Sequence, residues 1–153
     1  LFLLVQDLMF YLTHRLLHTK HFQHFHRVHH SSVIPTPFAF YCFHPVEAIV
    51  HFIRLPLIIA ICPTNFFVLL FAEGVMSNVL NAYSHMNHEP AWIKRFKSLH
   101  AHLAAASAYH GLHHIRGNGN YGGYFRLWDR LWGTILPESA AIDAKAYGEK
   151  SDK

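Results

Sequence analysis

The chain has 153 residues, of which 52% are hydrophobic and only 14% are charged. Soluble domains carry about 25% charged residues, so this composition argues against an ordinary soluble domain and favours one that faces lipid as well as its own core. The formal net charge of +4 suits contact with anionic lipid headgroups. No basic-aromatic platform or recognition motif accompanies that charge, so we expect no nucleic-acid partner.

The first 18 residues, LFLLVQDLMFYLTHRLLH, predict a helix that is apolar on most faces, with His14 and His18 toward one side. Residues 19–33 are polar and aromatic, and the Pro35-Thr36-Pro37 step that follows breaks any helix. The chain has no initial Met and no basic leading segment, so we interpret the first helix as truncated and expect membrane helices upstream of it.

Two long apolar stretches follow, residues 46–61 and residues 64–83. A helix needs about 20 apolar residues to span a bilayer. The second stretch approaches that requirement, whereas the first is interrupted by His51, Arg54 and Pro56. Together the two stretches predict a helical hairpin that dips into the membrane or crosses it.

The distribution of charge around the hairpin predicts its orientation. The hairpin turn has no Lys or Arg, and basic residues lie at the opposite ends: Arg15, Lys20, Arg27, Lys94, Arg95 and Lys97. By the positive-inside rule those ends face the cytoplasm. The histidine-rich segments lie at the same ends, so a site formed by them is predicted at the cytoplasmic surface of the membrane.

The last third of the chain predicts further helices. Residues 90–116 predict an amphipathic helix, residues 117–123 (GNGNYGG) a flexible turn, and residues 124–136 an apolar-aromatic helix at the membrane interface. The fold class is therefore all-α: a membrane-embedded helical bundle of hairpin and truncated N-terminal helix, with a cytoplasmic helical cap that carries the histidines. We assign residues 1–137 to one domain and residues 138–153 to a polar tail.

Histidine is the outlier of the composition, with 16 residues. Imidazole is the commonest metal ligand among side chains. The histidines form an HxxxH pair beginning at His14, HxxHH triples beginning at His26 and His110, and a separate histidine, His85. Residues at i, i+3 and i+4 of a helix share one face, with Cβ atoms about 5–6 Å apart, so each motif can direct two or three rings toward one place.

The number of clustered histidines favours two metal ions over one, because one ion rarely takes more than about six ligands. The predicted ligands are His14, His18, His26, His29, His30, His85, His110, His113 and His114. The alternative is a set of core or interfacial histidines without a metal. We prefer that interpretation for His21, His24, His51, His100 and His102.

Carboxylates and an amide are candidates for supporting this site. Metal-bound histidines usually donate their second N–H to a carboxylate or a carbonyl, a role that we assign to Asp7 and Asp129. An ion pair with Arg126 or Arg130 is an equal alternative for Asp129. Asn81 lies one turn before the isolated histidine and is expected to bond a metal-bound water or, alternatively, a neighbouring helix.

Two more histidines have two interpretations each. His44 lies in the sequence His-Pro-Val-Glu, which is compatible with a helix start and with support of the site. His88 lies close to His85 but not one helical turn from it, so it is either a ligand or a bystander.

The order HxxxH, HxxHH, HPxE, an isolated histidine after the hairpin, and HxxHH followed by NYGGYFRLWDRLWGT resembles the fatty acid hydroxylase/sterol desaturase superfamily over about residues 7–136. The resemblance implies an integral membrane enzyme with two iron ions, for which zinc can substitute in purified protein. It implies the nine histidines as ligands and residues 1–137 as an N-terminally truncated catalytic domain. The chain departs from some relatives at Asn81 and Tyr109, where those relatives carry histidine.

The resemblance further implies an oxidoreductase that uses O2 and external electrons to hydroxylate or desaturate a fatty acyl chain, a sterol or a related lipid. The electrons would come from a donor such as a cytochrome or a ferredoxin, since the chain has no flavin or dinucleotide motif. The alternative is a histidine-rich membrane protein that binds or transports metal, but transport requires ionisable residues through the depth of the spans, and the FFVLLF stretch has none. A bis-histidine haem carrier would leave most of the histidine motifs unused.

Overall fold

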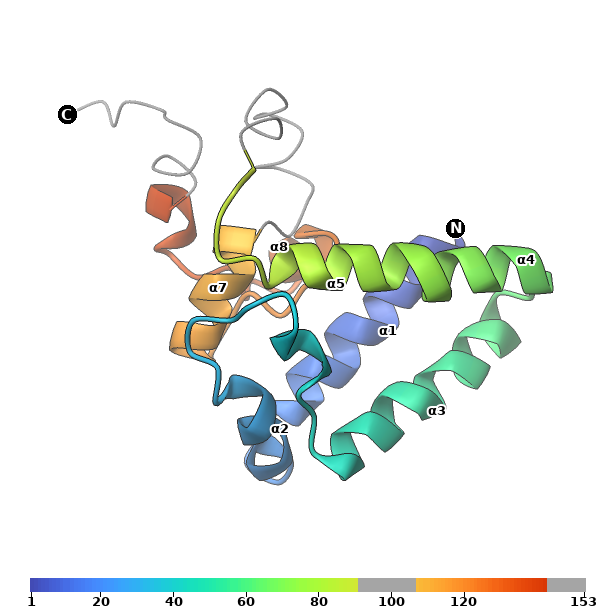
Figure 1. Cartoon of the computed structure of the whole chain (residues 1–153), viewed down its shortest axis with the longest axis horizontal. Coiled ribbons are helices and arrows are strands. Elements are labelled where there is room, and N and C mark those ends of the chain that lie inside the picture. The colour runs from blue at the N-terminus through green and yellow to red at the C-terminus, as the bar shows by residue number, and fades with distance from the viewer. Residues whose placement is uncertain (91–106, 143–153) are drawn as a thin grey trace.

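The computed structural model describes residues 1–90 and 107–142 (Figure 1). Within those two ranges every regular element is a helix, as the all-α prediction requires. The helices that carry histidines, α2 and α7, lie at the open end of the predicted hairpin, opposite its connecting loop (Figure 1). The fold therefore separates an apolar end from a histidine-rich end.

The predicted N-terminal helix is confirmed as α1, Phe2–Leu17. It packs against α3, Pro45–Ile61, and its buried face includes Tyr11, His14 and Leu17. His14 lies near the C-terminal end of α1, and α1 contacts α2. The HxxxH motif of the first helix is therefore close to the HxxHH motif of α2.

The predicted hairpin is also confirmed as a pair of helices. Its first arm is α3, which begins where the His44 ring accepts a hydrogen bond from the Val46 N–H and Pro45 occupies the first turn. Its second arm runs without a break through α4 (Phe66–Leu69), η2 (Leu70–Ser77) and α5 (Asn78–Ser84). Figure 1 shows the two arms meeting at one end and diverging toward α2 and α7.

The second arm is long and apolar enough to cross a membrane, with 19 residues and a mean hydropathy of 1.4 over its most apolar window. Large apolar side chains on both arms are exposed: Ile49, Phe52, Ile53, Leu57, Ile61, Phe66, Phe67, Val68, Leu70, Phe71, Val75 and Val79. Exposed apolar surface of this extent marks a face that meets lipid or another protein. That the helices form a membrane-embedded bundle with a cytoplasmic cap stays a prediction.

The winding of the second arm changes along its length. Leu70–Ser77 is a π-helix, a wider coil with i→i+5 hydrogen bonds that is frequent at functional sites. The Asn78 side chain caps this coil by donating to the carbonyls of Glu73 and Gly74. Glu73, Gly74 and Ser77 of this coil line a cavity that also reaches the histidines.

The predictions for residues 117–136 were wrong in two respects. The GNGNYGG segment was expected to be flexible, yet Asn120 and Tyr121 are buried, and the Asn120 amide binds Tyr109, Leu136 and Ser139. Residues 124–136 were expected to form one helix, but only α8, Leu127–Leu131, is helical. The chain turns at Gly133, whose φ of 64° ends the helix.

The end of the described chain packs against this loop. Ser139, at the start of the predicted tail, is buried against Asn120, and Arg116 in the last turn of α7, Ser107–Arg116, forms an ion pair with Glu138 at 2.6 Å. Two predicted parts lie outside the described residues: residues 143–153 of that tail, and the first part of the helix predicted over 90–116 with its basic residues Lys94, Arg95 and Lys97.

Candidate metal centre

The structure brings all nine predicted histidine ligands together at the open end of the hairpin. They come from α1, α2 (Gln23–His30), the end of α5 and α7. They form a five-histidine group and a four-histidine group, and within each group the candidate ligand atoms lie within 4.8 Å of one another. The first group is His14, His18, His26, His30 and His113; the second is His29, His85, His110 and His114.

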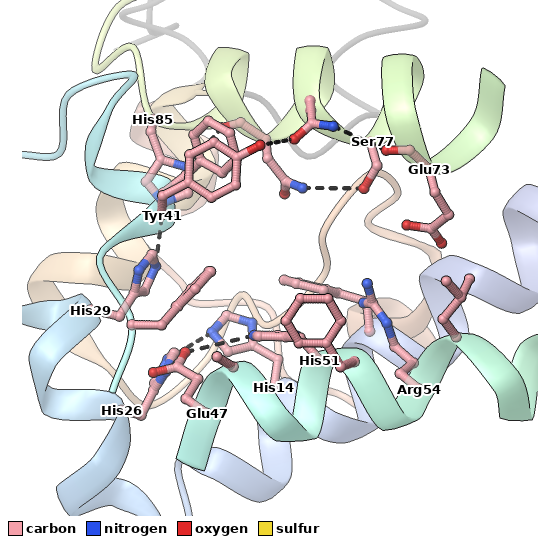
Figure 2. A pocket seen from close by; sticks show the side chains of 18 of the residues that line it. His14, His26, His29, Tyr41, Glu47, His51, Arg54, Glu73, Ser77 and His85 are labelled. Carbon is pink, nitrogen blue, oxygen red and sulfur yellow. Dashed lines mark hydrogen bonds and ion pairs between the residues drawn. The ribbon is translucent and has the colours of Figure 1, made fainter. Parts of the chain in front are cut away.

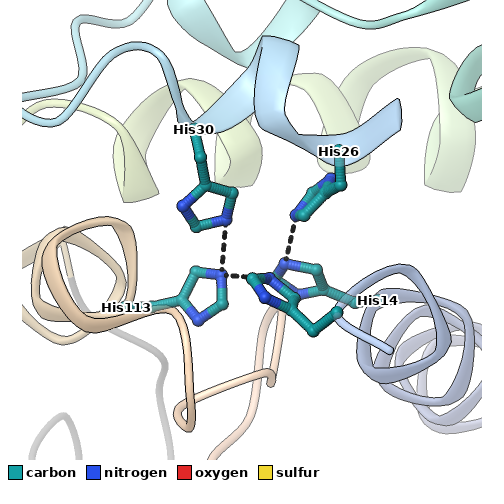
Figure 3. A group of neighbouring side chains, drawn as sticks. His14, His26, His30 and His113 are labelled. Carbon is teal, nitrogen blue, oxygen red and sulfur yellow. Dashed lines mark hydrogen bonds between the residues drawn. The ribbon is translucent and has the colours of Figure 1, made fainter. Parts of the chain in front are cut away.

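The five-histidine group is centred on His113, which is fully buried. Its Nε2 lies 3.1 Å from the Nε2 of His18 and 3.1 Å from that of His30, and the Nε2 atoms of His14 and His26 lie 3.2 Å apart (Figure 3). Every one of these approaches joins Nε2 to Nε2. The rings therefore present the same nitrogen to one small volume.

The four-histidine group has the same arrangement. The Nε2 of His85 lies 3.3 Å from that of His29 and 3.2 Å from that of His110, and the Nε2 atoms of His110 and His114 lie 3.2 Å apart. All four side chains are buried. The two triples thus each divide between the two groups, as the HxxHH spacing allows.

The two groups adjoin each other. The ring centroids of His30 and His114, one from each group, are 4.6 Å apart, and those of His14 and His110 are 6.1 Å apart. Two metal ions held by these groups would therefore be neighbours.

Backbone carbonyls orient the rings from outside. The Nδ1–H groups of His14, His113 and His85 donate to the carbonyls of Tyr121, Gly119 and Asn81 at 2.9, 2.7 and 2.8 Å. A neutral imidazole has one N–H, so these bonds leave a lone pair on each Nε2. The outer hydrogen bonds therefore fix the tautomer that binds a metal through Nε2.

The close approaches inside the groups fit metal ions better than hydrogen bonds. In the pair His30 and His113, both Nδ1 atoms face carbonyls, so two lone pairs face each other at 3.1 Å. Lone pairs at that distance repel unless a cation lies between them. Nitrogens about 2.0–2.1 Å from a tetrahedral zinc ion are about 3.3–3.4 Å apart. The Nε2 atoms of the two groups approach one another to 3.1–3.3 Å, close to that spacing.

Burial keeps these rings uncharged. The pKa of His113 lies well below its usual value because burial disfavours the charged ring and because its histidine neighbours repel a proton. The same causes lower the pKa of His30 to about 4 and that of His114 to about 2. The imidazoles of these three histidines are therefore neutral at pH 7, the form that coordinates a metal.

Glu47 is the carboxylate that supports the site, and the sequence reasoning missed this role. It is fully buried in the first turn of α3, and its Oε1 accepts a hydrogen bond from the His26 Nδ1–H at 2.6 Å. The HPxE motif was the available signal, because it places a glutamate at a helix start beside His44. A carboxylate behind a ligating histidine raises the basicity of the ring.

We expect Glu47→Gln to weaken metal binding by about 10–100-fold, the range typical of partners behind metal ligands. Glutamine keeps an acceptor oxygen but loses the charge that supports His26. Metal retained per chain during titration with a chelator measures the effect, with Glu138→Gln as the matched surface control. Equal retention in the two variants would mean that Glu47 only packs.

Asp7 and Asp129, predicted to orient histidines, bond no histidine among residues 1–90 and 107–142, where they hold a loop instead. Asp7 accepts the backbone N–H groups of Tyr124 and Phe125 at 2.6 and 3.3 Å. Asp129 accepts from the backbone N–H of Tyr121 at 2.9 Å and from three other donors in and around the loop. Both side chains hold the 119–125 segment, whose carbonyls in turn orient the histidines.

The Tyr109 hydroxyl is one of those donors, at 3.0 Å from Asp129 Oδ2. Tyr109 occupies the position where some relatives were expected to carry histidine. Here it is a buried support of the loop, and it does not belong to either histidine group.

The remaining candidates are placed as follows. His44 caps α3, and the exposed His88 bonds the Met86 carbonyl and belongs to neither group. The Asn81 side chain donates to Ser77 Oγ at 3.4 Å, while its carbonyl orients His85.

The histidines that were interpreted as non-ligands also lie outside the two groups wherever they are described. His21 and His24 are exposed, and His51 stacks on Phe10 and packs beside Phe43. His100 and His102 lie outside the described ranges.

A cavity of about 530 Å³ opens beside the histidines (Figure 2). Its wall includes five of them: His14, His26, His29, His85 and His110. Much of the remaining wall is apolar and includes Phe10, Phe40, Phe43, Phe52 and Leu55. The volume lies in the usual range of small-molecule sites, about 300–1,000 Å³, and an apolar molecule in it would touch the candidate metal ligands.

Comparison with known proteins agrees with this geometry. The fatty acid hydroxylase family model matches residues 1–134. The rat lathosterol oxidase is 32% identical over 91% of this chain and 45% of its own length. Delta(7)-sterol 5(6)-desaturases of Gibberella zeae and Saccharomyces cerevisiae are 32% and 30% identical, over 90% and 97% of this chain and 38% and 39% of theirs.

The chain thus spans about two fifths of the length of the curated relatives it matches. No solved structure matches it. Because the family model covers nearly the whole chain and the histidine motifs converge in space, the chain belongs to the fatty acid hydroxylase family.

Proposed function

We propose that this chain is the catalytic core of a membrane oxidoreductase that hydroxylates or desaturates a lipid C–H bond with O2 and external electrons. The observation that carries the proposal is the pair of adjoining histidine groups in the wall of an apolar cavity. The named activities of the relatives, sterol desaturation and lathosterol oxidation, support a lipid substrate of the sterol type.

Under this proposal each histidine group holds one iron ion, and zinc takes the same nitrogen donors in purified protein. The five-histidine group and the four-histidine group supply the ligands. Bound iron supplies the activation of O2 and the oxidation of an otherwise unreactive C–H bond.

The protein's own contribution is orientation and exclusion of water. Glu47 and the carbonyls of Gly119 and Tyr121 hold the rings so that their lone pairs converge. The phenylalanine-rich wall binds the apolar body of the lipid and keeps bulk water from the histidine end of the cavity. Asn81 supports this end through its carbonyl bond to His85.

We propose that the hairpin is embedded in the bilayer and that the histidine end faces the cytoplasm. The arms expose apolar side chains, and three basic residues near the histidine end are exposed: Arg15, Lys20 and Arg27. Basic residues favour the cytoplasmic side and attract anionic headgroups. A cytochrome or ferredoxin would reach the metals from this side.

The test is to purify the protein from membranes, measure metal per chain, and assay O2-dependent oxidation of sterol and fatty acyl lipids. We expect two metal ions per chain and lipid oxidation, both lost in a His29→Ala, His113→Ala double variant. Oxidation that survives the double variant would refute the proposal. Haem absorbance, or uptake of radioactive metal into vesicles without lipid oxidation, would instead identify an electron carrier or a transporter.

A further inference from the structure

The end of the cavity away from the histidines carries two opposite charges. Arg54 of α3 and Glu73 of η2 both line the cavity and face each other from the two arms of the hairpin (Figure 2). Arg54 is only 9% exposed. Its Nε and Nη1 and the Oε1 of Glu73 are buried and make no hydrogen bond within the described part of the chain.

On each arm of the hairpin, polar side chains follow one another along the cavity wall from the histidine end to Arg54 or Glu73. On α3 the row is Glu47, His51 and Arg54, spaced by four and three residues, so all three share one face of the helix. On the facing arm Glu73, Ser77, Asn81 and His85 follow one another at four-residue steps and all line the cavity. A molecule in the cavity therefore meets metal ligands at one end and Arg54 with Glu73 at the other.

Direct pairing does not account for these two side chains. No ion pair within 4.0 Å joins Arg54 to Glu73, although both are fully described. Arg54 instead lies over the Phe10 ring, with its Cζ 5.4 Å from the centroid. Ionisable side chains in a membrane helix are costly and typically mark a substrate or ion pathway.

The chemistry of the pair selects a ligand group. The guanidinium of Arg54 can only donate hydrogen bonds, and the carboxylate of Glu73 can only accept them. Their charges cancel, so the pair as a whole offers no net attraction to a ligand carboxylate or to a ligand amine. A hydroxyl is neutral and both donates and accepts, so it satisfies the two side chains at once.

We propose that Arg54 and Glu73 bind the hydroxyl group of a lipid alcohol whose apolar body fills the cavity toward the histidines. This inference rests on the proposed function and narrows its substrate class: hydroxylated lipids, such as sterols or long-chain alcohols, are bound in preference to free fatty acids. Arg54 and Glu73 position the substrate and do not touch the metals.

The test measures binding of tritiated cholesterol and tritiated hexadecanol to the purified full-length protein in nanodiscs. Unlabelled competitors then displace each tritiated alcohol: the same alcohol, its O-methyl ether and, for hexadecanol, palmitic acid. The concentration that displaces half of the label is compared among them. For at least one alcohol we expect its methyl ether to compete at least tenfold more weakly, and we expect palmitic acid to compete more weakly than hexadecanol. Glu73→Gln and Arg54→Met are each expected to reduce the preference for that alcohol over its ether by about tenfold.

The surface variants Glu138→Gln and Arg130→Met are the matched controls and should keep that preference. An unchanged preference in both cavity variants, or palmitic acid as the best competitor, would overturn the inference. Metal per chain and lipid oxidation are measured on the same preparations. These two measurements distinguish a failure of the hydroxyl site from a failure of the proposed function. Oxidation with two bound metals but no alcohol preference refutes the hydroxyl site alone, whereas alcohol binding without metal or oxidation refutes the oxidoreductase.

Discussion

If the proposed function holds, a His113→Ala variant loses one of the two proposed metal ions and, with it, all measurable lipid oxidation. His113 is fully buried, and its Nε2 lies 3.1 Å from those of both His18 and His30, so its removal opens the five-histidine group at its centre. Loss of a partner behind a ligand costs about 10–100-fold in affinity. Loss of the ligand itself should exceed that range.

Metal analysis by mass spectrometry, together with product formation from a sterol, measures the two effects. His88→Ala is the matched control, because His88 is exposed and belongs to neither group. We expect the control to keep two metals and full activity. If His113→Ala kept both metals, the five-histidine group would not be a metal site. The loss of a single metal, with the four-histidine group still loaded, would show that the two groups bind separately.

The convergence of the candidate histidine ligands could be predicted from sequence because most of their signal is local. HxxxH and HxxHH spacing places rings on one helix face wherever that helix goes, and α1, α2 and α7 confirm those faces. The isolated His85 has no such partner in its own segment. We included His85 among the predicted ligands because of the family resemblance and because it follows the hairpin.

The supporting partners could not be predicted because they are distant in sequence. Glu47 lies 21 residues from His26, and the Tyr121 carbonyl lies 107 residues from His14. Spacing rules say nothing about such pairs, so Asp7 and Asp129 were as plausible as Glu47. Both aspartates are buried, but they bind backbone N–H groups of the loop.

The loop after α7 was misjudged for a related reason. Glycine-rich segments usually predict flexibility, and the apolar run after it predicts a helix. Here glycine provides space for close contacts, and the apolar run is divided between a short helix and a packed turn. The hydrophobic pattern alone does not distinguish a continuous helix from a chain that folds back onto Asn120.

The space that glycine provides in this loop leads to the second large effect. A Cβ atom at Gly122 would lie 2.4 Å from the Phe125 carbonyl oxygen and 2.8 Å from Asp129 Oδ2. The backbone must therefore shift, because the closer contact is to a backbone oxygen and the Asp129 carboxylate is itself held by several hydrogen bonds. A shift breaks the 2.7 Å bond from the Gly122 N–H to Asp129 and displaces Tyr121, whose carbonyl orients His14.

We therefore expect Gly122→Ala to destabilise the fold by roughly 1–3 kcal/mol, the usual cost of overpacking, and to release metal from the five-histidine group. Thermal unfolding in detergent and metal content measure the two consequences. Gly133→Asn is the matched control in the same region, since a Cβ added there would have no atom of residues 1–90 or 107–142 within 4 Å, and asparagine tolerates the φ of 64°. A Gly122→Ala protein that unfolds at the control's temperature and keeps both metals would show that the loop does not set the histidine geometry.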